Sequence, residues 1–160
     1  MMKVIKNFLT KEDFEPLQKL LMSSNFPWFY SSQINYMNDK PDLQHYMYHL
    51  FYKEHAVNSD YFEYLSPLIV KLKINALIRI KANLYPYQPT IKEHDFHVDF
   101  NYPHKAALFA INNNNGYTRL KGKKIKSREN QIIMFKGNEL HASSTCSDQS
   151  IRININFNYL

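Results

Sequence analysis

The end of the sequence, residues 150–159, alternates strictly between apolar and polar side chains. The apolar positions are Ile151, Ile153, Ile155 and Phe157, and the polar positions are Arg152, Asn154, Asn156 and Asn158. Because successive side chains of a β-strand point to opposite faces, this period predicts a strand with one face in an apolar core. The arginine among three asparagines indicates that the other face lines a cavity.

Short segments of the same kind, separated by turn residues, fill the sequence from residue 75 onward. The other strands expected there are residues 76–85, 96–100, 105–112, 117–120, a short strand at Ile125, 131–135 and 140–144. Turn signals lie between them: the Asn-rich residues 113–116, whose Asn and Gly tolerate positive φ, and a Lys-Gly turn at 121–122. About eight short strands in this order favour a jelly roll, or double-stranded β-helix.

The first half of the sequence mixes helices with strands. We expect strands at residues 2–9 and 44–52 and a helix capped by Thr10. A second helix is expected from Asn58 to about Lys71, with Pro67 kinking it or limiting its length. These helices are expected to cover one side of the jelly roll.

The length of 160 residues suits one domain. We expect a mainly β fold with supporting helices (α+β), a single domain over residues 1–160. Within it, residues 1–74 are a helical and strand support region, and residues 75–159 are the jelly-roll catalytic core. No apolar run approaches 18 residues, no basic-then-apolar leader opens the chain, and Cys146 is the single cysteine. We therefore expect a soluble protein of the reducing cytoplasm, with no membrane partner.

The chain is basic, with a formal net charge of +6. Its dense basic cluster is residues 121–126, flanked by Arg119 and Arg128. The cluster contains a glycine and alternating apolar residues, which is typical of a solvated hairpin tip. Docking of phosphates, and hence a nucleic-acid partner, is the other interpretation, but no aromatic-interleaved motif supports it.

The candidate chemistry begins at His97-x-Asp99. If residues 96–100 form a strand, both side chains point the same way. His141 follows an apolar strand and a polar turn, and in a jelly roll such a strand end can return over the first pair. Two histidines and one carboxylate make the facial triad of non-haem Fe(II) oxygenases, which leaves positions open for a co-substrate and O₂. The alternative is an ordinary polar pair on a strand surface.

The polar faces of two strands offer an anchor for an anion. Arg152 can grip the distal carboxylate of a dicarboxylate with a bidentate fork, and Asn154 shares its face. Asn83 and Tyr85 project from the earlier strand with donors of their own. Arg79 and Lys81 lie on that same face, and for them a cavity and an exposed sheet face stay equally open.

The pattern His97-x-Asp99, then His141, then Arg152-x-Asn154 resembles the iron- and 2-oxoglutarate-dependent dioxygenases. It is most similar to the prolyl-4-hydroxylase-like branch, in the small stand-alone form carried by bacteria and phages. The resemblance covers about residues 75–159. A phage-encoded protein of this kind would act in the host cytoplasm.

The resemblance implies an oxidoreductase that uses Fe(II), 2-oxoglutarate and O₂, with ascorbate in support. The implied Fe(II) ligands are His97, Asp99 and His141. The implied 2-oxoglutarate contacts are Arg152, at the C5 carboxylate, and Tyr85, Asn83 and Asn154. The reaction implied is decarboxylation of 2-oxoglutarate to succinate and CO₂ coupled to oxidation of a substrate.

The resemblance leaves the substrate open. The leading hypothesis is prolyl-type hydroxylation of an amino-acid side chain of a peptide or protein. The alternatives are a nucleobase demethylase or hydroxylase and a non-catalytic metal-binding module. Gly116-Tyr117-Thr118-x-Leu120 replaces the Gly-Gly-x-Leu turn of many hydroxylases, so the substrate rim is expected to differ. We expect that rim at residues 86–95 and 26–36.

The remaining histidines suggest no second metal site. His45 and His49 would lie about 13 Å apart on a strand, too far to share one ion. We expect them and His55 to be surface or structural residues. For His94 and His104, which flank the candidate metal motif, a surface position is favoured over a role at the site.

Overall fold

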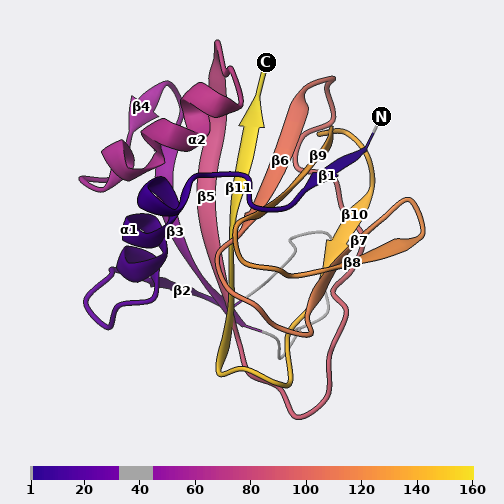
Figure 1. The fold of residues 1–160 in the computed structure, drawn as a ribbon. Helices are drawn as coiled ribbons and strands as arrows, with labels where there is room; N and C mark the ends of the chain where they lie inside the picture. The colour runs from indigo at the N-terminus through magenta and orange to yellow at the C-terminus, as the bar shows by residue number, and fades with distance from the viewer. Residues whose placement is uncertain (1, 33–44) are drawn as a thin grey trace.

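The computed structural model describes residues 2–32 and 45–160. Its strands form two antiparallel sheets, one in the order β1-β9-β6-β11-β5-β3-β2 with β4 paired to β3, and one in the order β10-β7-β8 (Figure 1). The larger sheet consists of β1 (Lys3–Ile5), β2 (Phe29–Ser31), β3 (Tyr46–Lys53), β4 (Ala56–Val57), β5 (Leu77–Pro86), β6 (Lys105–Ala110), β9 (Gln131–Lys136) and β11 (Ile151–Tyr159). The smaller sheet consists of β7 (Tyr117–Leu120), β8 (Lys123–Lys126) and β10 (His141–Ser143). The predicted fold class, mainly β with supporting helices in a jelly roll, is confirmed.

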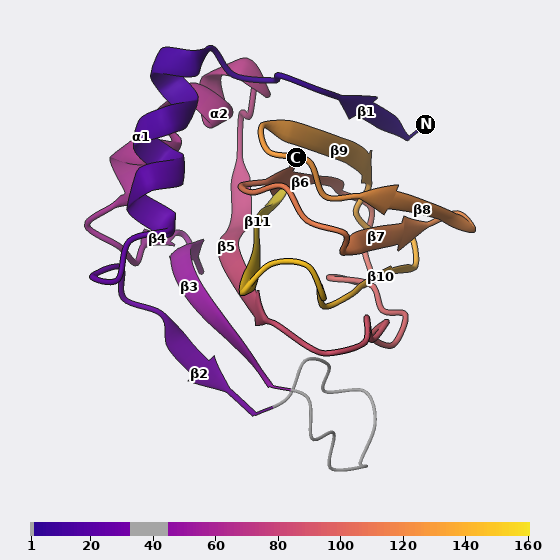
Figure 2. The ribbon, with the colours of Figure 1, turned by 60° about the horizontal axis from the view of Figure 1, so that its bottom comes forward.

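Two short helical regions cover one side of the larger sheet. They are α1 (Lys11–Leu21) and the pair formed by the 3₁₀-helix η1 (Phe62–Leu65) and α2 (Ser66–Lys71). Figure 2 shows α1 and α2 on one side of this sheet and β7, β8 and β10 on the other. The strands β1, β2 and β3 from the first 74 residues join this larger sheet, where β3 pairs with β5 and β1 pairs with β9. None of the helices in the described ranges is long and apolar enough to cross a membrane.

The main core lies between the helices and the larger sheet. The apolar row of β11 and its neighbours on β5 pack there against leucines of the helices, including Leu17, Leu21 and Leu68. The alternation predicted for residues 150–159 is therefore confirmed, with Ile153, Ile155 and Phe157 fully buried in this core. The polar rows of β5 and β11 necessarily point to the opposite face, into the space between the two sheets.

The expected cap of α1 is confirmed, whereas the second helix is shorter than predicted. The Thr10 hydroxyl accepts a hydrogen bond from the Asp13 backbone N–H at 3.2 Å. The predicted continuous helix from Asn58 was wrong: residues 62–65 are 3₁₀ and α2 begins at Ser66, with Pro67 in its first turn. Proline has no N–H to donate and its ring collides with a preceding helical turn, so it fits only the start of a helix.

The two predicted glycine turns differ in what they require of the backbone. Lys121 and Gly122 both have positive φ, as a two-residue hairpin turn needs. Residues 113–116 lie in the predicted connection, between β6 and β7, but none of them has positive φ. Gly116 is needed there for space instead, because a Cβ would lie 2.6 Å from Cδ of Arg152 and 2.7 Å from the Thr145 carbonyl oxygen.

Three of the histidines are buried structural groups. His49 bonds the Pro27 carbonyl oxygen and the Ser59 hydroxyl, both at 2.7 Å, which confirms a satisfied structural role. The surface positions expected for His94 and His104 were wrong, since their side chains are 5% and 7% exposed. His94 packs on the Tyr85 ring at 5.1 Å between centroids, and one of its ring nitrogens bonds the Ser143 hydroxyl at 2.7 Å.

His104 is buried because a glycine faces it. Gly137, in the turn after β9, donates its N–H to the His104 carbonyl oxygen at 2.8 Å. A Cβ at Gly137 would collide with the His104 ring. The imidazole thus occupies the space where any other residue at position 137 would place its side chain.

Replacing Gly137 by alanine is expected to destabilise the protein by about 1–3 kcal/mol, because the His104 ring must move in a packed interior. Urea unfolding of the two proteins measures the difference. The matched control is Gly122→Asn, since this glycine has open space around it and asparagine tolerates its positive φ. Equal unfolding midpoints for Gly137→Ala and wild type would contradict the packing described here.

The metal-free protein is expected to lose stability as the pH falls from about 6.5 towards 4. Burial, and then the charges of Arg152 and His97, lower the pKa of His94 to about 3. Between pH 3 and 6.5, the His94 side chain therefore binds a proton in the unfolded chain but not in the folded chain, so this residue alone makes stability rise with pH by about 1.4 kcal/mol per unit. His94→Asn should flatten the measured slope by about that amount. His55→Asn, at an exposed position, is the control whose slope should match wild type.

Candidate metal centre

Backbone pairing brings His97 and His141 together. His97 and His141 exchange both backbone hydrogen bonds at 3.0 Å, and their rings lie 4.5 Å apart between centroids. Nδ1 of His97 lies 3.3 Å from the Asp95 carbonyl oxygen, and Nδ1 of His141 lies 3.0 Å from that of Glu139. A carbonyl only accepts, so Nδ1 donates in both rings and the lone pair of each Nε2 is left for a metal.

The strand expected at residues 96–100 was wrong. Around the metal motif, the chain pairs with its neighbour only at isolated bridges, Glu93 with Ser144 and His97 with His141. The physical reason is that β10 is only three residues long, so the ladder ends at His97. Asp99 lies beyond the ladder, and side-chain contacts determine its orientation.

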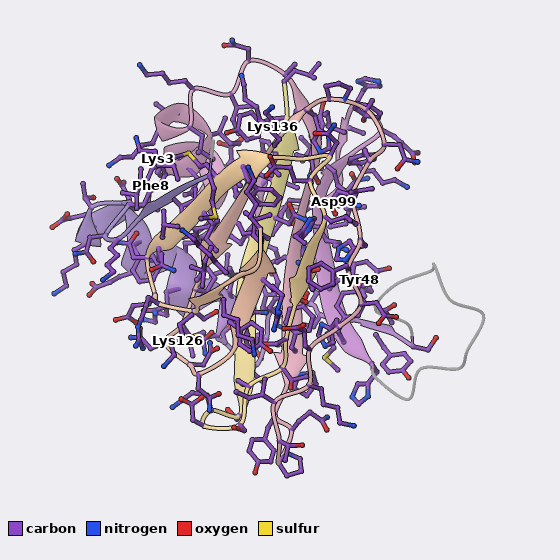
Figure 3. The ribbon with its side chains drawn as sticks, turned by 90° about the vertical axis from the view of Figure 1, so that its right-hand side faces the viewer. Lys3, Phe8, Tyr48, Asp99, Lys126 and Lys136 are labelled. Carbon is purple, nitrogen blue, oxygen red and sulfur yellow. The ribbon has the colours of Figure 1, made fainter. Side chains whose placement is uncertain are left out.

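Three side chains hold the Asp99 carboxylate, which Figure 3 labels. Arg79 donates to Oδ1 at 2.6 Å, and the amides of Asn156 and Asn158 donate to Oδ2 at 2.8 and 2.9 Å. Burial alone would raise the pKa of this carboxyl, but Arg79, His141 and the two amides outweigh it and hold the pKa well below its usual range. Asp99 is therefore an anion at any physiological pH. Arg79, whose place was left open by the sequence, faces the site.

The three candidate ligands converge. One ligand atom from each of His97, Asp99 and His141 lies within 4.8 Å of the others, and no second cluster of this kind occurs in residues 2–32 and 45–160. Burial, and next His141, lower the pKa of His97 to about 4, so its imidazole is neutral. Neutral imidazoles and a carboxylate suit Fe(II) and related divalent ions. The donor set therefore fits an iron ion.

A pocket lies against these ligands, between the two sheets. The residues that line it are Tyr46, Lys81, Asn83, Tyr85, His97, Asp99, Leu108, Thr118, His141, Ser143, Asn154 and Asn156. The predicted co-substrate residues Asn83, Tyr85 and Asn154 are thus in one pocket with the triad, and Asn83 donates to the Asn154 amide oxygen at 3.0 Å. Their contacts with 2-oxoglutarate stay predictions. Lys81 also faces this cavity, so that of the two positions the sequence left open, cavity and exposed sheet face, the cavity is the one observed.

Arg152 is the most deeply buried charge of the site, with 1% of its surface exposed. Its guanidinium donates to the Ser127 hydroxyl at 3.0 Å, the Ser144 carbonyl oxygen at 3.1 Å and the Thr118 hydroxyl at 3.2 Å. It also lies 5.3 Å above the Tyr85 ring. All of these partners are neutral, and Arg152 has no carboxylate partner in the described part of the chain. A buried cation without a counter-ion is a strong attractor for an anion.

The sequence interpretation missed three hydroxyl and carbonyl partners of this arginine. Thr118, Ser127 and Ser144 come from the region between β7 and the loop after β10. Isolated serines and threonines carry no motif, so no sequence signal distinguishes these three from surface hydroxyls. Thr118 lies on β7, opposite β10, and its buried side chain lines the pocket.

Comparisons with known proteins place this fold. No protein-family model matches the sequence, and no curated protein matches it by sequence. Among solved structures, a viral collagen prolyl hydroxylase from Paramecium bursaria Chlorella virus-1, in complex with 2-oxoglutarate, is 13% identical, with 98% of this chain and 94% of that chain covered and a TM-score of 0.64. An oxidoreductase of the 2OG-Fe(II) oxygenase family from Burkholderia pseudomallei is 10% identical over 99% of this chain and 84% of that chain, with a TM-score of 0.71.

A third similar structure is a prolyl hydroxylase from Trichoplax adhaerens, in complex with a peptide fragment of the oxygen degradation domain of hypoxia inducible factor. It is 11% identical over 99% of this chain and 83% of that chain, with a TM-score of 0.66. At such identities the likeness shows the fold. The chain has the double-stranded β-helix fold of the 2-oxoglutarate- and Fe(II)-dependent oxygenases.

Proposed function

We propose that this protein is an Fe(II)- and 2-oxoglutarate-dependent dioxygenase. One observation carries the proposal: the His97–Asp99–His141 cluster shares a region between the sheets with a buried arginine that has no carboxylate partner among the described residues. A metal site and an anion site side by side fit a co-substrate that chelates a metal with one end and presents a carboxylate at the other. The fold supports this proposal.

Each residue has a role in this proposal. His97, Asp99 and His141 would hold Fe(II). Arg152, with the Thr118 hydroxyl beside it, would bind the distal carboxylate of 2-oxoglutarate. The middle of the co-substrate would lie along the Asn83–Asn154 pair and Tyr85. When bound, iron would supply the activation of O₂, coupled to the conversion of 2-oxoglutarate to succinate and CO₂.

The protein's own contribution is positioning. Arg79 and two asparagines keep Asp99 ionised and in one orientation. The backbone carbonyls at Asp95 and Glu139 fix the tautomer of both histidines. The pocket lies between the two sheets, so that side chains from both sheets surround the candidate metal ligands.

For the substrate, we propose an amino-acid side chain of a peptide or protein, prolyl-type. Two of the proteins that share the fold are prolyl hydroxylases by name, and one was solved with a peptide bound. A nucleobase substrate has no comparable support, because the basic residues 121–126 lie at a hairpin tip. The non-enzymatic alternative is a metal-binding module, which would bind a metal without forming succinate.

Purified protein with Fe(II), ascorbate and 2-oxoglutarate is expected to form succinate, slowly without substrate and faster with a cell lysate as substrate source. His97→Ala should abolish this turnover and weaken Co(II) binding, measured from the visible absorption of Co(II), because one of three ligands is lost. His55→Ala, at an exposed position, is the matched control. Metal binding without succinate formation in the wild type would favour the non-catalytic module.

Arg152→Met is expected to raise the dissociation constant for 2-oxoglutarate about 100-fold, because a buried carboxylate would lose its charged partner. Titration of the Mn(II)-loaded protein with 2-oxoglutarate measures this constant without turnover. Arg128→Met is the control, since Arg128 is exposed and its side chain has no role in the pocket. An unchanged constant for Arg152→Met would place the anchor elsewhere.

A further inference from the structure

A second cation in the pocket has no role in the function proposed above. Lys81 lies on β5 in the row that also holds Arg79 and Asn83, and it lines the pocket with the candidate metal ligands. Its ammonium donates to the Tyr46 hydroxyl at 3.3 Å and lies 5.4 Å from the centre of the Tyr46 ring. Lys81 therefore reaches from β5 towards β3 across the floor of the pocket.

No carboxylate of the described chain neutralises Lys81. The single acidic side chain that lines the pocket is Asp99. That carboxylate is already paired with Arg79 and accepts from two amides, and Lys81 forms no ion pair with any described residue. Tyr46 offers a hydroxyl and a ring, which orient an ammonium but do not cancel its charge.

The charges of the site support a second anion. Arg79, Lys81 and Arg152 bring three positive charges, whereas Asp99 brings one negative charge, and a divalent metal would add two more positive charges. Burial, and next the charge of Arg79, lower the pKa of Lys81 to about 8, so the ammonium is retained at neutral pH at a cost. A cost of this kind is relieved when a carboxylate enters the pocket.

Lys81 and Arg152 lie at different positions along the paired strands β5 and β11, and their side chains bond different partners. Tyr85 on β5 is opposite Arg152 on β11, whereas Lys81 on β5 is opposite Asn156, whose amide donates to Asp99. The two positions are four residues apart along the strands, or about 13 Å between backbone positions. Lys81 thus lines the pocket at the candidate metal ligands, whereas Arg152 lines a neighbouring cavity that shares Thr118 and Asn154 with this pocket.

We propose that Lys81, with the Tyr46 hydroxyl, forms a second carboxylate-binding subsite at the metal end of the pocket; this inference rests on the proposed function. The carboxylate has two possible sources. One is the C1 carboxylate of 2-oxoglutarate, next to its keto group. The other is a carboxylate of the primary substrate, in which case the enzyme selects an acidic substrate or a free amino acid.

The test compares wild type with Lys81→Met, which keeps the length of the side chain and removes its charge, and Lys81→Arg, which restores the charge. Lys105→Met is the matched control, because Lys105 also lies over a tyrosine ring, that of Tyr159, but outside the pocket. All proteins are loaded with Mn(II), which prevents turnover. Affinities are measured for 2-oxoglutarate and for 4-oxopentanoate, which keeps the ketone and distal carboxylate but has a methyl group in place of the C1 carboxylate.

If Lys81 binds the C1 carboxylate, Lys81→Met weakens 2-oxoglutarate binding about tenfold or more and leaves 4-oxopentanoate unchanged. Lys81→Arg then recovers much of the loss. If Lys81 binds the primary substrate, 2-oxoglutarate affinity is unchanged. With 2-oxoglutarate bound, wild type then prefers L-proline over L-prolinamide, and Lys81→Met loses that preference.

Two results would overturn the inference. One is that Lys81→Met matches wild type for 2-oxoglutarate and for L-proline. The other is an equal loss for 2-oxoglutarate and 4-oxopentanoate, which indicates a damaged pocket rather than a missing charge. Both outcomes leave the proposed function intact as long as wild type binds 2-oxoglutarate. A wild type that does not bind 2-oxoglutarate at all fails the proposed function itself, and the inference with it.

Discussion

The pairing of β11 with β5 is the interaction on which the rest of the site depends. Its register sets Arg152 opposite Tyr85, Asn154 opposite Asn83, Asn156 opposite Lys81 and Asn158 opposite Arg79. Because side chains alternate along both strands, one pairing places the two polar rows on the side of the pocket and their apolar partners in the core under the helices. The members of the polar rows that line the pocket are Lys81, Asn83, Tyr85, Asn154 and Asn156. A slip of one residue would exchange the two faces, burying an arginine and three asparagines among leucines. The apolar packing that stabilises the fold therefore also fixes the order of charges in the site.

With this order of residues, the cationic side chains at the site outnumber the carboxylates. Among residues 2–32 and 45–160, Arg152 bonds neutral partners and Lys81 bonds the Tyr46 hydroxyl, whereas Asp99 pairs with Arg79. A chain selected for stability alone would replace such cations with apolar side chains. Anionic ligands would balance the excess positive charge of the pocket. Their binding would then raise the free energy of unfolding of the protein.

The sequence predicted those parts of the molecule that depend on local pattern. The period of two in β11 and β5 placed the eight polar side chains of the two strands on the correct face, and Thr10 marked the start of α1. It failed where distant segments decide the structure. The segment after His97 looks like a strand by composition, but its partner β10 is too short to pair with it. Nothing local to His94 or His104 shows that Tyr85 or Gly137 will cover them.

The connection between Gly137 and Asp99 shows why such long-range effects matter for the site. The Asn158 amide nitrogen lies 2.9 Å from Oδ2 of Asp99 and 3.2 Å from Nε2 of His104. Nδ1 of His104 lies 2.9 Å from the Tyr102 carbonyl oxygen and donates to it, so Nε2 is the nitrogen that accepts from the Asn158 amide. One amide group can then give one hydrogen to each partner. Asp99, the candidate metal ligand, is thereby held by Asn158, Asn158 contacts His104, and the His104 ring occupies the space left by the missing side chain at position 137.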